Sequence, residues 1–321
     1  MIKRRTVIAA GTLLAASAAR AQDRFPSKPL RLVVPYAAGG IGDTMARTLA
    51  VPLGELLGQT VIVDNRAGGD AAIGTEHVMR SAPDGYTLLQ IVTAQAINAI
   101  TKPNLRYDLL RDFEPVARIV RAPAVLLVAG ASPYRSVADL LEAAKTRAGG
   151  LNFGSGATGS VGHLAGELFA RIAKLRAMHV PYKGNALVIQ DMVGGRIDFM
   201  FGTPVEAVAN AKSGLLRALL VTSGARLAEL PGVPTAAELG WRDFDASSFF
   251  GYMVPAGTPP AIVRQLQDAI LKSLASPAMQ ERLRTLALAP DPGGADALRA
   301  TVKADTARWA ELIKAANIQV E

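Results

Sequence analysis

Two glycine-rich segments, one in each half of the chain, hold the residues best suited to chemistry. The first covers residues 35–43 and the second residues 154–160, and each contains three glycines. Each follows an apolar run and precedes an amphipathic stretch, so each should join a strand to a helix. Glycine lets the backbone approach a ligand closely, and a helix N-terminus offers free N–H groups and the positive end of its dipole. The pair therefore predicts two loops that grip a small anion from both sides.

The second segment also contains a pattern known from dinucleotide-binding proteins. Gly154, Gly156 and Gly159 form a GxGxxG sequence between a strand-like and a helix-like segment. Dinucleotide-binding folds place an acidic residue about 20 positions further on, where it binds the ribose. Residues 174–179 of this chain contain no carboxylate. The sequence therefore argues against a dinucleotide, and we expect no cofactor.

Patterns for catalysis and for metal binding are weak. The three histidines, His77, His163 and His179, lack the i, i+4 spacing of zinc-binding helices. The chain contains no cysteine, which excludes disulfides, thiolate metal sites and cysteine nucleophiles. No GxSxG nucleophile elbow occurs either. We therefore expect no metal, no catalytic residue and no enzymatic activity, with a secreted serine hydrolase as a distant alternative.

Alternating strand-like and helix-like segments must position the two loops. The first third of the chain reads strand, helix, strand, helix, strand, which predicts a parallel sheet with helices on its faces. The alternation restarts after Pro123, and the last third adds helices near 260–274 and 295–315. Extended segments near 120–128 and 249–254 would cross between the two units. The sequence thus predicts two α/β units joined by two crossovers.

These crossovers divide the chain into lobes. We expect lobe 1 to consist of residues 22–122 and 249–300, and lobe 2 of residues 123–248. Lobe 1 is discontinuous in this scheme because two crossovers return the chain to it after lobe 2 is complete. Residues 301–321 are expected to form a C-terminal helix that packs across the lobes.

The amino terminus predicts the compartment. A basic cluster at residues 3–5 precedes an apolar run at residues 7–19, and Ala19-Arg20-Ala21 matches the pattern that signal peptidase cleaves. The apolar run is too short to cross a bilayer core. We therefore expect residues 1–21 to be a signal peptide, read by the Sec or the twin-arginine route, and the mature protein to be periplasmic.

The net charge of +8 is partly a property of this amino-terminal segment. The segment carries four basic residues and no acid, so removing four positive charges from +8 leaves +4. The remaining basic residues are scattered singly, without the interleaved aromatic residues of nucleic-acid-binding surfaces. We expect no nucleic-acid partner, and we expect a monomer.

A series of short motifs runs through the mature chain, at residues 35–47, 58–68, 84–89, 107–116, 154–164, 180–184, 230–238 and 255–259. In this order they resemble the solute receptors of tripartite tricarboxylate transporters, also called the Bug family, over essentially the whole mature chain. The resemblance implies a type II periplasmic-binding-protein fold, with two doubly wound α/β lobes, two extended crossovers and a cleft between them. It also implies a binding protein without catalysis.

The resemblance assigns binding residues in both lobes. In lobe 1 they are Tyr36, Ala38, Gly39, Gly40 and Asp43 of the first loop, Ala72, and the polar pair Thr93 and Gln95 after the third strand. In lobe 2 they are Ser155, Thr158, Ser160 and His163. Asp43 is expected to cap the helix and order the loop, because a carboxylate against an anionic ligand would repel it. A buried structural role for His163 stays open.

Three departures from the family pattern bear on the solute. One feature agrees with the family: its members hold ligand carboxylates with backbone amides, and the two loops here contain no Arg or Lys. The departures lie elsewhere. Ala72 stands where the family has a polar residue, and Asp70 introduces an acid close to the cleft. Ile41 and Gly42 replace a polar pair, which makes the wall more apolar. These departures leave the solute open among a dicarboxylate, an amino acid and an aromatic acid.

The function that the resemblance implies is that of an extracytoplasmic receptor. Such a protein closes on a small carboxylate-bearing solute and delivers it to the membrane subunits of a tripartite tricarboxylate-type transporter. A receptor that reports the solute to a sensor kinase without transporting it is the alternative.

Overall fold

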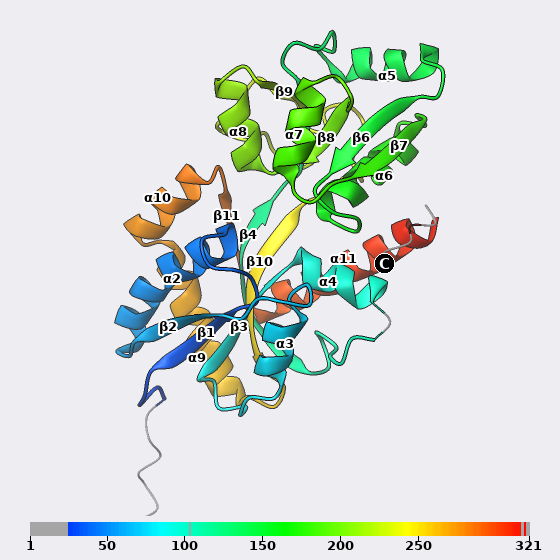
Figure 1. Cartoon of the computed structure of the whole chain (residues 1–321). Helices are drawn as coiled ribbons and strands as arrows, with labels where there is room; N and C mark the ends of the chain where they lie inside the picture. Colours follow the sequence, from blue (N-terminus) through cyan, green and yellow to red (C-terminus); the bar gives the residue numbers. More distant parts are fainter. Residues whose placement is uncertain (1–24, 103, 316–317, 319–321) are drawn as a thin grey trace, which may run out of the picture.

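The computed structural model describes residues 25–102, 104–315 and 318, which form two α/β lobes, each built on its own sheet (Figure 1). The expected signal peptide, residues 1–21, lies outside the described residues, as does the end of the expected C-terminal helix. Within the described ranges, no helix is both long enough and apolar enough to cross a membrane.

The first sheet has six strands in the order β11-β4-β10-β3-β1-β2. They are β1 (Leu30–Val34), β2 (Val61–Asn65), β3 (Thr87–Val92), β4 (Phe113–Ala122), β10 (Ser248–Pro255) and β11 (Ala289–Gly293). β1 lies parallel to β2 and to β3, as the sequence predicted, because helices α2 (Ile41–Leu57) and α3 (Ala72–Met79) carry the chain back between them. β10 is antiparallel to β3 and β4, and β11 is antiparallel to β4. The sheet is therefore mixed rather than wholly parallel.

Helices cover both faces of this sheet. Leu32 of β1 belongs to one core cluster with Met45 and Leu49 of α2, whereas the next residue, Val33, belongs to a cluster that includes Leu298 of α11 (Ala295–Ala315). Successive side chains of a strand point to opposite faces, so both faces of β1 are buried. This explains why β1 is a nearly continuous apolar run in the sequence.

The second sheet has five strands in the order β7-β6-β8-β5-β9. They are β5 (Val125–Ala129), β6 (Leu151–Ser155), β7 (Ala177–Pro181), β8 (Phe199–Gly202) and β9 (Leu216–Val221). The helices of this lobe are α5 (Val137–Thr146), α6 (Val161–Ile172), α7 (Asn185–Val193) and α8 (Pro204–Lys212). β6 is parallel to β7 and β8, and β5 is antiparallel to β8 and β9. Its core contains stacked and edge-on phenylalanines, among them Phe153, Phe169 and Phe199.

Several helices begin where the sequence supplies a start signal. Ser136 and Thr203 each accept a hydrogen bond from the third residue of the helix that follows, which stabilises α5 and α8. Proline occupies the first turn of α8, α9 (Pro260–Leu274) and α10 (Pro277–Thr285), where its missing N–H costs nothing.

Two strands cross between the lobes side by side (Figure 1). β4 ends at Ala122 and β5 begins at Val125, so Pro123 and Ala124 are the whole connection on the outward path. β10 returns the chain along β4, with Ser248 opposite Ala122. Arg121 forms an ion pair of 2.7 Å with Asp245, just before β10. These short paired segments fit the two crossovers of the expected fold class.

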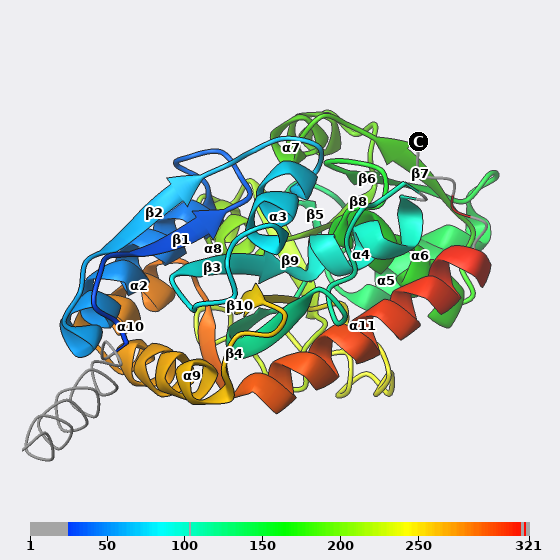
Figure 2. The same cartoon turned by 90° about the horizontal axis from the view of Figure 1, so that it is seen from below.

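Helix α11 contacts both lobes. Leu298 and Val302, near its start, pack in the core of the first lobe, whereas Trp309 and Leu312 pack with the core of the second. Figure 2 shows this helix running along one side of the molecule, from the first sheet towards α6. The residue limits that the sequence suggested for the lobes and for the cross-lobe helix stay a prediction.

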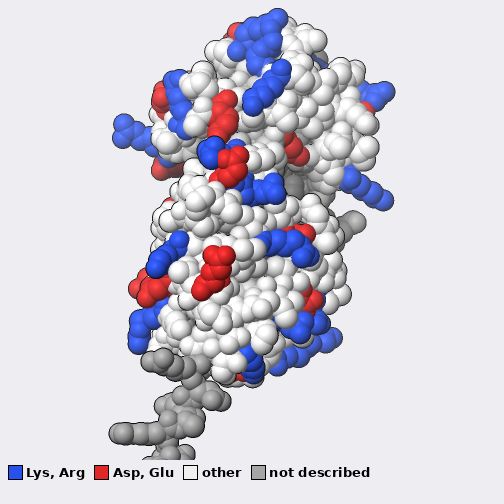
Figure 3. Space-filling view, turned by 90° about the vertical axis from the view of Figure 1, so that its left-hand side faces the viewer, with Lys and Arg blue, Asp and Glu red and all other residues white. Residues whose placement is uncertain are grey.

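Surface charges of both signs are mixed. On the face shown in Figure 3, Lys and Arg side chains lie among Asp and Glu side chains over both lobes. Across the described surface, opposite charges also pair, such as Arg226 with Glu238 at 3.0 Å and Arg31 with Asp64 at 2.8 Å. The face shown in Figure 3 carries no extended field of one sign that would attract a polyanion.

Candidate functional site

The first glycine-rich loop, residues 35–40, turns into α2 through a residue with left-handed backbone. Gly39 has φ = +86°, a conformation that glycine adopts without strain. Its N–H donates to Asp43 Oδ2 at 2.9 Å, and Asp43 Oδ1 pairs with Arg47 Nε at 2.9 Å. Burial opposes ionisation of Asp43, but the hydrogen bonds from Arg47 and the Gly39 N–H outweigh it and lower the pKa of the carboxyl.

Asp43 therefore orders the loop, as expected, but it does not cap the helix. The residue that caps α2 is Gly40, and no described side chain caps this helix. Asp43 is the third residue of α2, and it orders the loop by accepting the N–H of Gly39 from inside the helix.

The second glycine-rich loop, residues 156–160, is closed in the same way. Gly159 has φ = +75°, and its N–H donates to His163 Nδ1 at 3.0 Å. His163 is the third residue of α6, and it is buried. Ser160 caps the helix by accepting the His163 N–H at 3.3 Å. His163 therefore has the structural role that the sequence left open.

A stack of side chains supports the second loop from behind. The rings of His163 and His179 are stacked with their centroids 3.6 Å apart, and Ser155 Oγ lies 2.7 Å from His179 Nε2. Burial, and to a smaller extent His163, lower the pKa of His179 to about 3, so this ring is neutral at physiological pH. Ser155 is almost completely buried and also donates to the Ala157 carbonyl at 2.9 Å. Ser155 thus holds the loop in shape and does not face the cleft.

Between the lobes lie two adjoining chambers. The inner chamber, next to the crossovers, has a volume of about 260 Å³. The outer chamber has a volume of about 680 Å³ and is lined by Tyr36, Asp70, Ala94, Asn98, Thr101, Lys102, Ala157, Thr158, Gly159, Ser160 and Pro181. Ala94 and Ser160 line both, so the chambers meet at the starts of α4 (Thr93–Thr101) and α6.

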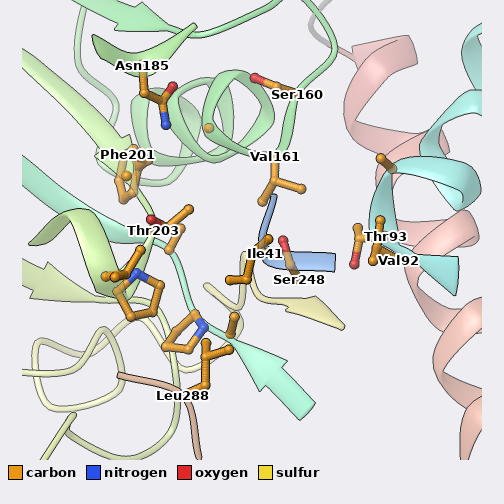
Figure 4. Close-up of a pocket in the computed structure, with 18 of the residues that line it drawn as sticks. Ile41, Val92, Thr93, Ser160, Val161, Asn185, Phe201, Thr203, Ser248 and Leu288 are labelled. Atoms are coloured by element: carbon orange, nitrogen blue, oxygen red, sulfur yellow. The ribbon is translucent and has the colours of Figure 1, made fainter. Parts of the chain in front are cut away.

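Five helices begin in the wall of the inner chamber. Residues from the first turns of α2, α4, α6, α7 and α8 line it, among them Ile41, Ala94, Val161, Asn185 and Pro204. Figure 4 shows Ile41 and Val161 close to one another, with Asn185, Phe201 and Thr203 to one side and Thr93 to the other. The N-cap residues of α2, α4 and α7 are Gly40, Val92 and Gly184, and none of their side chains caps the helix, although Gln95 accepts the Val92 N–H at the start of α4. Uncapped N-termini leave N–H donors and the positive ends of helix dipoles available to an anion.

Four residues that the sequence assigned to the site line these chambers. They are Tyr36, Thr93, Thr158 and Ser160. Tyr36 donates its hydroxyl to Gln95 Oε1 at 3.1 Å, and burial raises the pKa of this phenol, which keeps it a donor. Thr93 Oγ1 accepts the N–H of Phe249 at 2.9 Å. Direct contact of these side chains with a solute stays a prediction.

The remaining assigned residues lie outside the chamber walls. Asp43, Gln95, Ser155 and His163 are buried supports; Gln95 Oε1, for instance, accepts the N–H of Val92 at 2.8 Å at the start of α4. Ala38, Gly39 and Gly40 lie exposed on the first loop, and Ala72 begins α3.

Sequence reasoning missed a charged pair in the outer chamber. Lys102, after the end of α4, forms an ion pair with Asp70. Asp70 and Ala71 both have left-handed backbone, with φ of +52° and +76°. Non-glycine residues rarely adopt this conformation. The unusual acid at Asp70 was the only sequence signal for this pair. Helix α4 was not predicted, so no sequence pattern placed Lys102 next to Asp70.

Sequence reasoning also missed the apolar residues of the inner chamber. Phe201, Phe250, Leu286 and Leu288 line it and come from three separate regions of the chain. Only the apolar pair at Ile41 and Gly42 indicated such a wall.

The family assignment rests on comparison with known proteins. A profile described as "Tripartite tricarboxylate transporter family receptor" matches residues 45–318. The chain belongs to this family. A UPF0065 protein from the tcbD-tcbE intergenic region of Pseudomonas sp. (strain P51) is 38% identical over 316 residues, which are 97% of this chain and 94% of that protein.

Solved structures agree with the family. The periplasmic binding protein BugD superposes with a TM-score of 0.75 at 32% identity, covering 92% of this chain and 100% of BugD. Rpa4515 of R. palustris with adipate gives a TM-score of 0.78 at 34% identity, covering 92% of this chain and 99% of Rpa4515. The two-lobed periplasmic-binding-protein fold predicted from the sequence is confirmed. The family and these neighbours are solute-binding proteins, not enzymes.

Proposed function

We propose that this receptor binds a small carboxylate between its lobes in the periplasm and delivers it to the membrane subunits of a tripartite tricarboxylate-type transporter. The observation that carries the proposal is the convergence of five helix N-termini on one chamber. The residues that line this chamber include no charged side chain. An anion bound there takes its hydrogen bonds from backbone N–H groups rather than from a lysine or arginine side chain.

The relatives support the same class of solute and compartment. Rpa4515 was solved with adipate, a dicarboxylate, and BugD is a periplasmic binding protein. Delivery to a transporter is supported by the family description, which names its members receptors of tripartite tricarboxylate transporters.

Closure of the lobes is the mechanical part of the proposal. The lobes are joined by the short β4–β5 connection, by β10 and by α11, so a small rotation at these segments brings the two loops together. Hinges of this kind absorb domain closure at the ends of strands. Small-angle scattering should show a smaller radius of gyration when a bound acid is added, and an unchanged profile would contradict closure.

Thermal unfolding tests binding directly. The mature protein, freed of any bound solute, is heated with mono-, di- and tricarboxylates, amino acids, aromatic acids and sugars. A ligand present at 100 times its Kd stabilises the folded state by about 2.7 kcal/mol. At least one acid should raise the Tm clearly. Stabilisation by sugars alone, or by nothing in the panel, would overturn the proposal.

A further inference from the structure

The inner chamber is built for an apolar body. Besides small residues, its wall consists largely of aliphatic and aromatic side chains, namely Ile41, Val92, Val161, Phe201, Val205, Phe250, Leu286 and Leu288. In Figure 4 the side chains of Ile41 and Val161 lie near the centre of the group, with Leu288 below them. A ligand that enters this chamber gains contact with hydrocarbon on most sides.

The polar side chains of the wall are largely engaged within the protein. Asn185 Nδ2 donates to Glu206 Oε1 at 3.0 Å, and Thr203 Oγ1 donates to Glu206 Oε2 at 2.9 Å. Thr93 Oγ1 and Ser160 Oγ each accept a backbone N–H, at 2.9 Å and 3.3 Å. Ligand hydroxyls placed against the hydrocarbon wall would lose their hydrogen bonds to water and find few side-chain partners, because the polar groups lie at the helix starts. Each such hydroxyl weakens binding by about tenfold.

The size of the chamber sets a limit on the body. An apolar cavity of about 150 Å³ is large enough to hold benzene. The inner chamber, at about 260 Å³, therefore accommodates one six-membered ring with a short substituent.

The carboxylate has a separate place at the edge of this chamber. Ala94 and Ser160, which line both chambers, lie at the starts of α4 and α6. A carboxylate held there points its apolar body towards Phe201 and Phe250 and stays close to water in the outer chamber.

On the basis of the function proposed above, we propose that the solute is a carboxylic acid with a single unhydroxylated ring, such as a benzoate-type acid. The carboxylate binds at the starts of α4 and α6, and the ring fills the inner chamber. The apolar wall, rather than a charged side chain, selects the solute.

Isothermal titration of the solute-free mature protein tests this with a matched pair of ligands. Cyclohexanecarboxylate and quinate share a six-membered ring and one carboxylate, but the ring of quinate carries hydroxyl groups. Benzoate and malate complete the set. We expect benzoate and cyclohexanecarboxylate to bind at least tenfold more tightly than quinate and malate.

The possible outcomes distinguish failure of the ring-acid inference from failure of the proposed carboxylate binding. Equal or tighter binding of quinate or malate would overturn the ring-acid inference and leave carboxylate binding intact. Absence of binding by every acid, including those of the wider thermal panel, would overturn the proposed function itself.

A pair of variants tests the wall independently. Val161→Thr places a hydroxyl in the chamber at almost unchanged shape and should weaken benzoate binding about three- to tenfold, without loss of fold by circular dichroism. The matched control is Val193→Thr, at an exposed valine on α7, which should bind benzoate like the wild type. Unchanged affinity in a folded Val161→Thr protein would contradict a ring in this chamber.

Discussion

The two glycine-rich loops share one geometry and differ in charge. In each loop a left-handed glycine donates its N–H to the side chain four residues later, which is the third residue of the following helix. In the first loop the acceptor is the ionised Asp43, balanced by Arg47. In the second loop it is the imidazole of His163, stacked on His179.

The two loops thus have the same backbone geometry, but one is held by a charged acceptor and the other by an imidazole ring. A carboxylate near a helix N-terminus stabilises the helix but competes with an anionic ligand for the same positive potential. Arg47 offsets this competition in the first loop. In the second loop the glycine N–H is accepted by an imidazole rather than a carboxylate, and the nearest acid, Glu167, lies 3.6 Å from the other ring nitrogen of His163 and does not bond to the loop glycine. We therefore expect lobe 2 to contribute more than lobe 1 to carboxylate affinity.

The largest expected effect comes from giving the second loop the acceptor of the first. His163→Asp places a carboxylate at a buried position, next to Glu167 and with no arginine to balance it. We expect the free energy of unfolding to fall by about 3 kcal/mol and carboxylate affinity to fall at least tenfold. Chemical denaturation and titration calorimetry measure the two.

A double variant tests whether charge balance is the cause. Adding Glu167→Arg to His163→Asp copies the Asp43–Arg47 spacing of the first loop. It should recover at least half of the lost free energy of unfolding, relative to Glu167→Arg alone. No recovery would mean that the two loops are not held by equivalent devices.

Removing the charge of the acceptor in the first loop should have a smaller effect on stability and should not weaken carboxylate binding. Asp43→Asn keeps an acceptor for the Gly39 N–H and removes the charge that pairs with the half-exposed Arg47. We expect the free energy of unfolding to fall by about 1 kcal/mol and carboxylate affinity to stay unchanged or rise. A tenfold loss of affinity in titration calorimetry would contradict a purely supporting role for Asp43.

The pH dependence of stability should separate the loops further. Because burial lowers the pKa of His179 from 6.5 to about 3, the unfolded chain takes up this proton before the folded protein does. The stabilising contribution of neutral His179 is thus complete above pH 6.5 and is lost as the pH falls towards 3. Asp43 has its pKa lowered from 3.8, so its contribution is lost only below pH 3.8.

Variants make this difference measurable. Between pH 6.5 and 3.8, His179→Gln should reduce the slope of unfolding free energy against pH, whereas Asp43→Asn should leave the slope unchanged. Denaturant titrations across this range provide the slopes. Equal slopes in His179→Gln and wild type would contradict a lowered pKa of the half-buried His179.

The smallest effect concerns a third loop, residues 68–71, in which the non-glycine residues Asp70 and Ala71 have left-handed backbone. Asp70→Gly removes the strain of φ = +52° and should raise the free energy of unfolding by about 1 kcal/mol, less the small contribution of the exposed pair with Lys102. Asp70→Ala keeps the strain and loses the pair, so it should be less stable than wild type by chemical denaturation. If both variants changed stability alike, backbone strain at Asp70 would not be the cause.

Sequence patterns predicted most of the elements because most of them have local signals. The expected helix near 295–315 matches α11, and the strand–helix alternation matches β1 to β3. Helix α4 was missed because it begins at Thr93, directly after the last residue of β3, Val92. No glycine or proline marks this boundary in the sequence. β11 was missed because Pro290 and Pro292 argue against a strand, and it is tolerated only at the sheet edge.

The sequence predicted where the backbone loops of the candidate site lie, but not the roles of their side chains. Glycine spacing located both loops, but the roles of Asp43 and His163 depend on helix geometry, which brings their side chains back to Gly39 and Gly159. The inner chamber was out of reach because its apolar wall combines residues far apart in the chain, such as Ile41, Phe201 and Leu288. Their proximity is a result of tertiary packing.

The most direct test of carboxylate binding by the helix N-termini compares an acid with its amide. Titration of the solute-free protein with benzoate and with benzamide keeps the ring and changes only the group that the helix N-termini would bind. Charge-assisted hydrogen bonds to a carboxylate are about twice as strong as neutral ones. We expect the acid to bind at least tenfold more tightly than the amide. Equal affinities would contradict a carboxylate held by helix N-termini between the lobes.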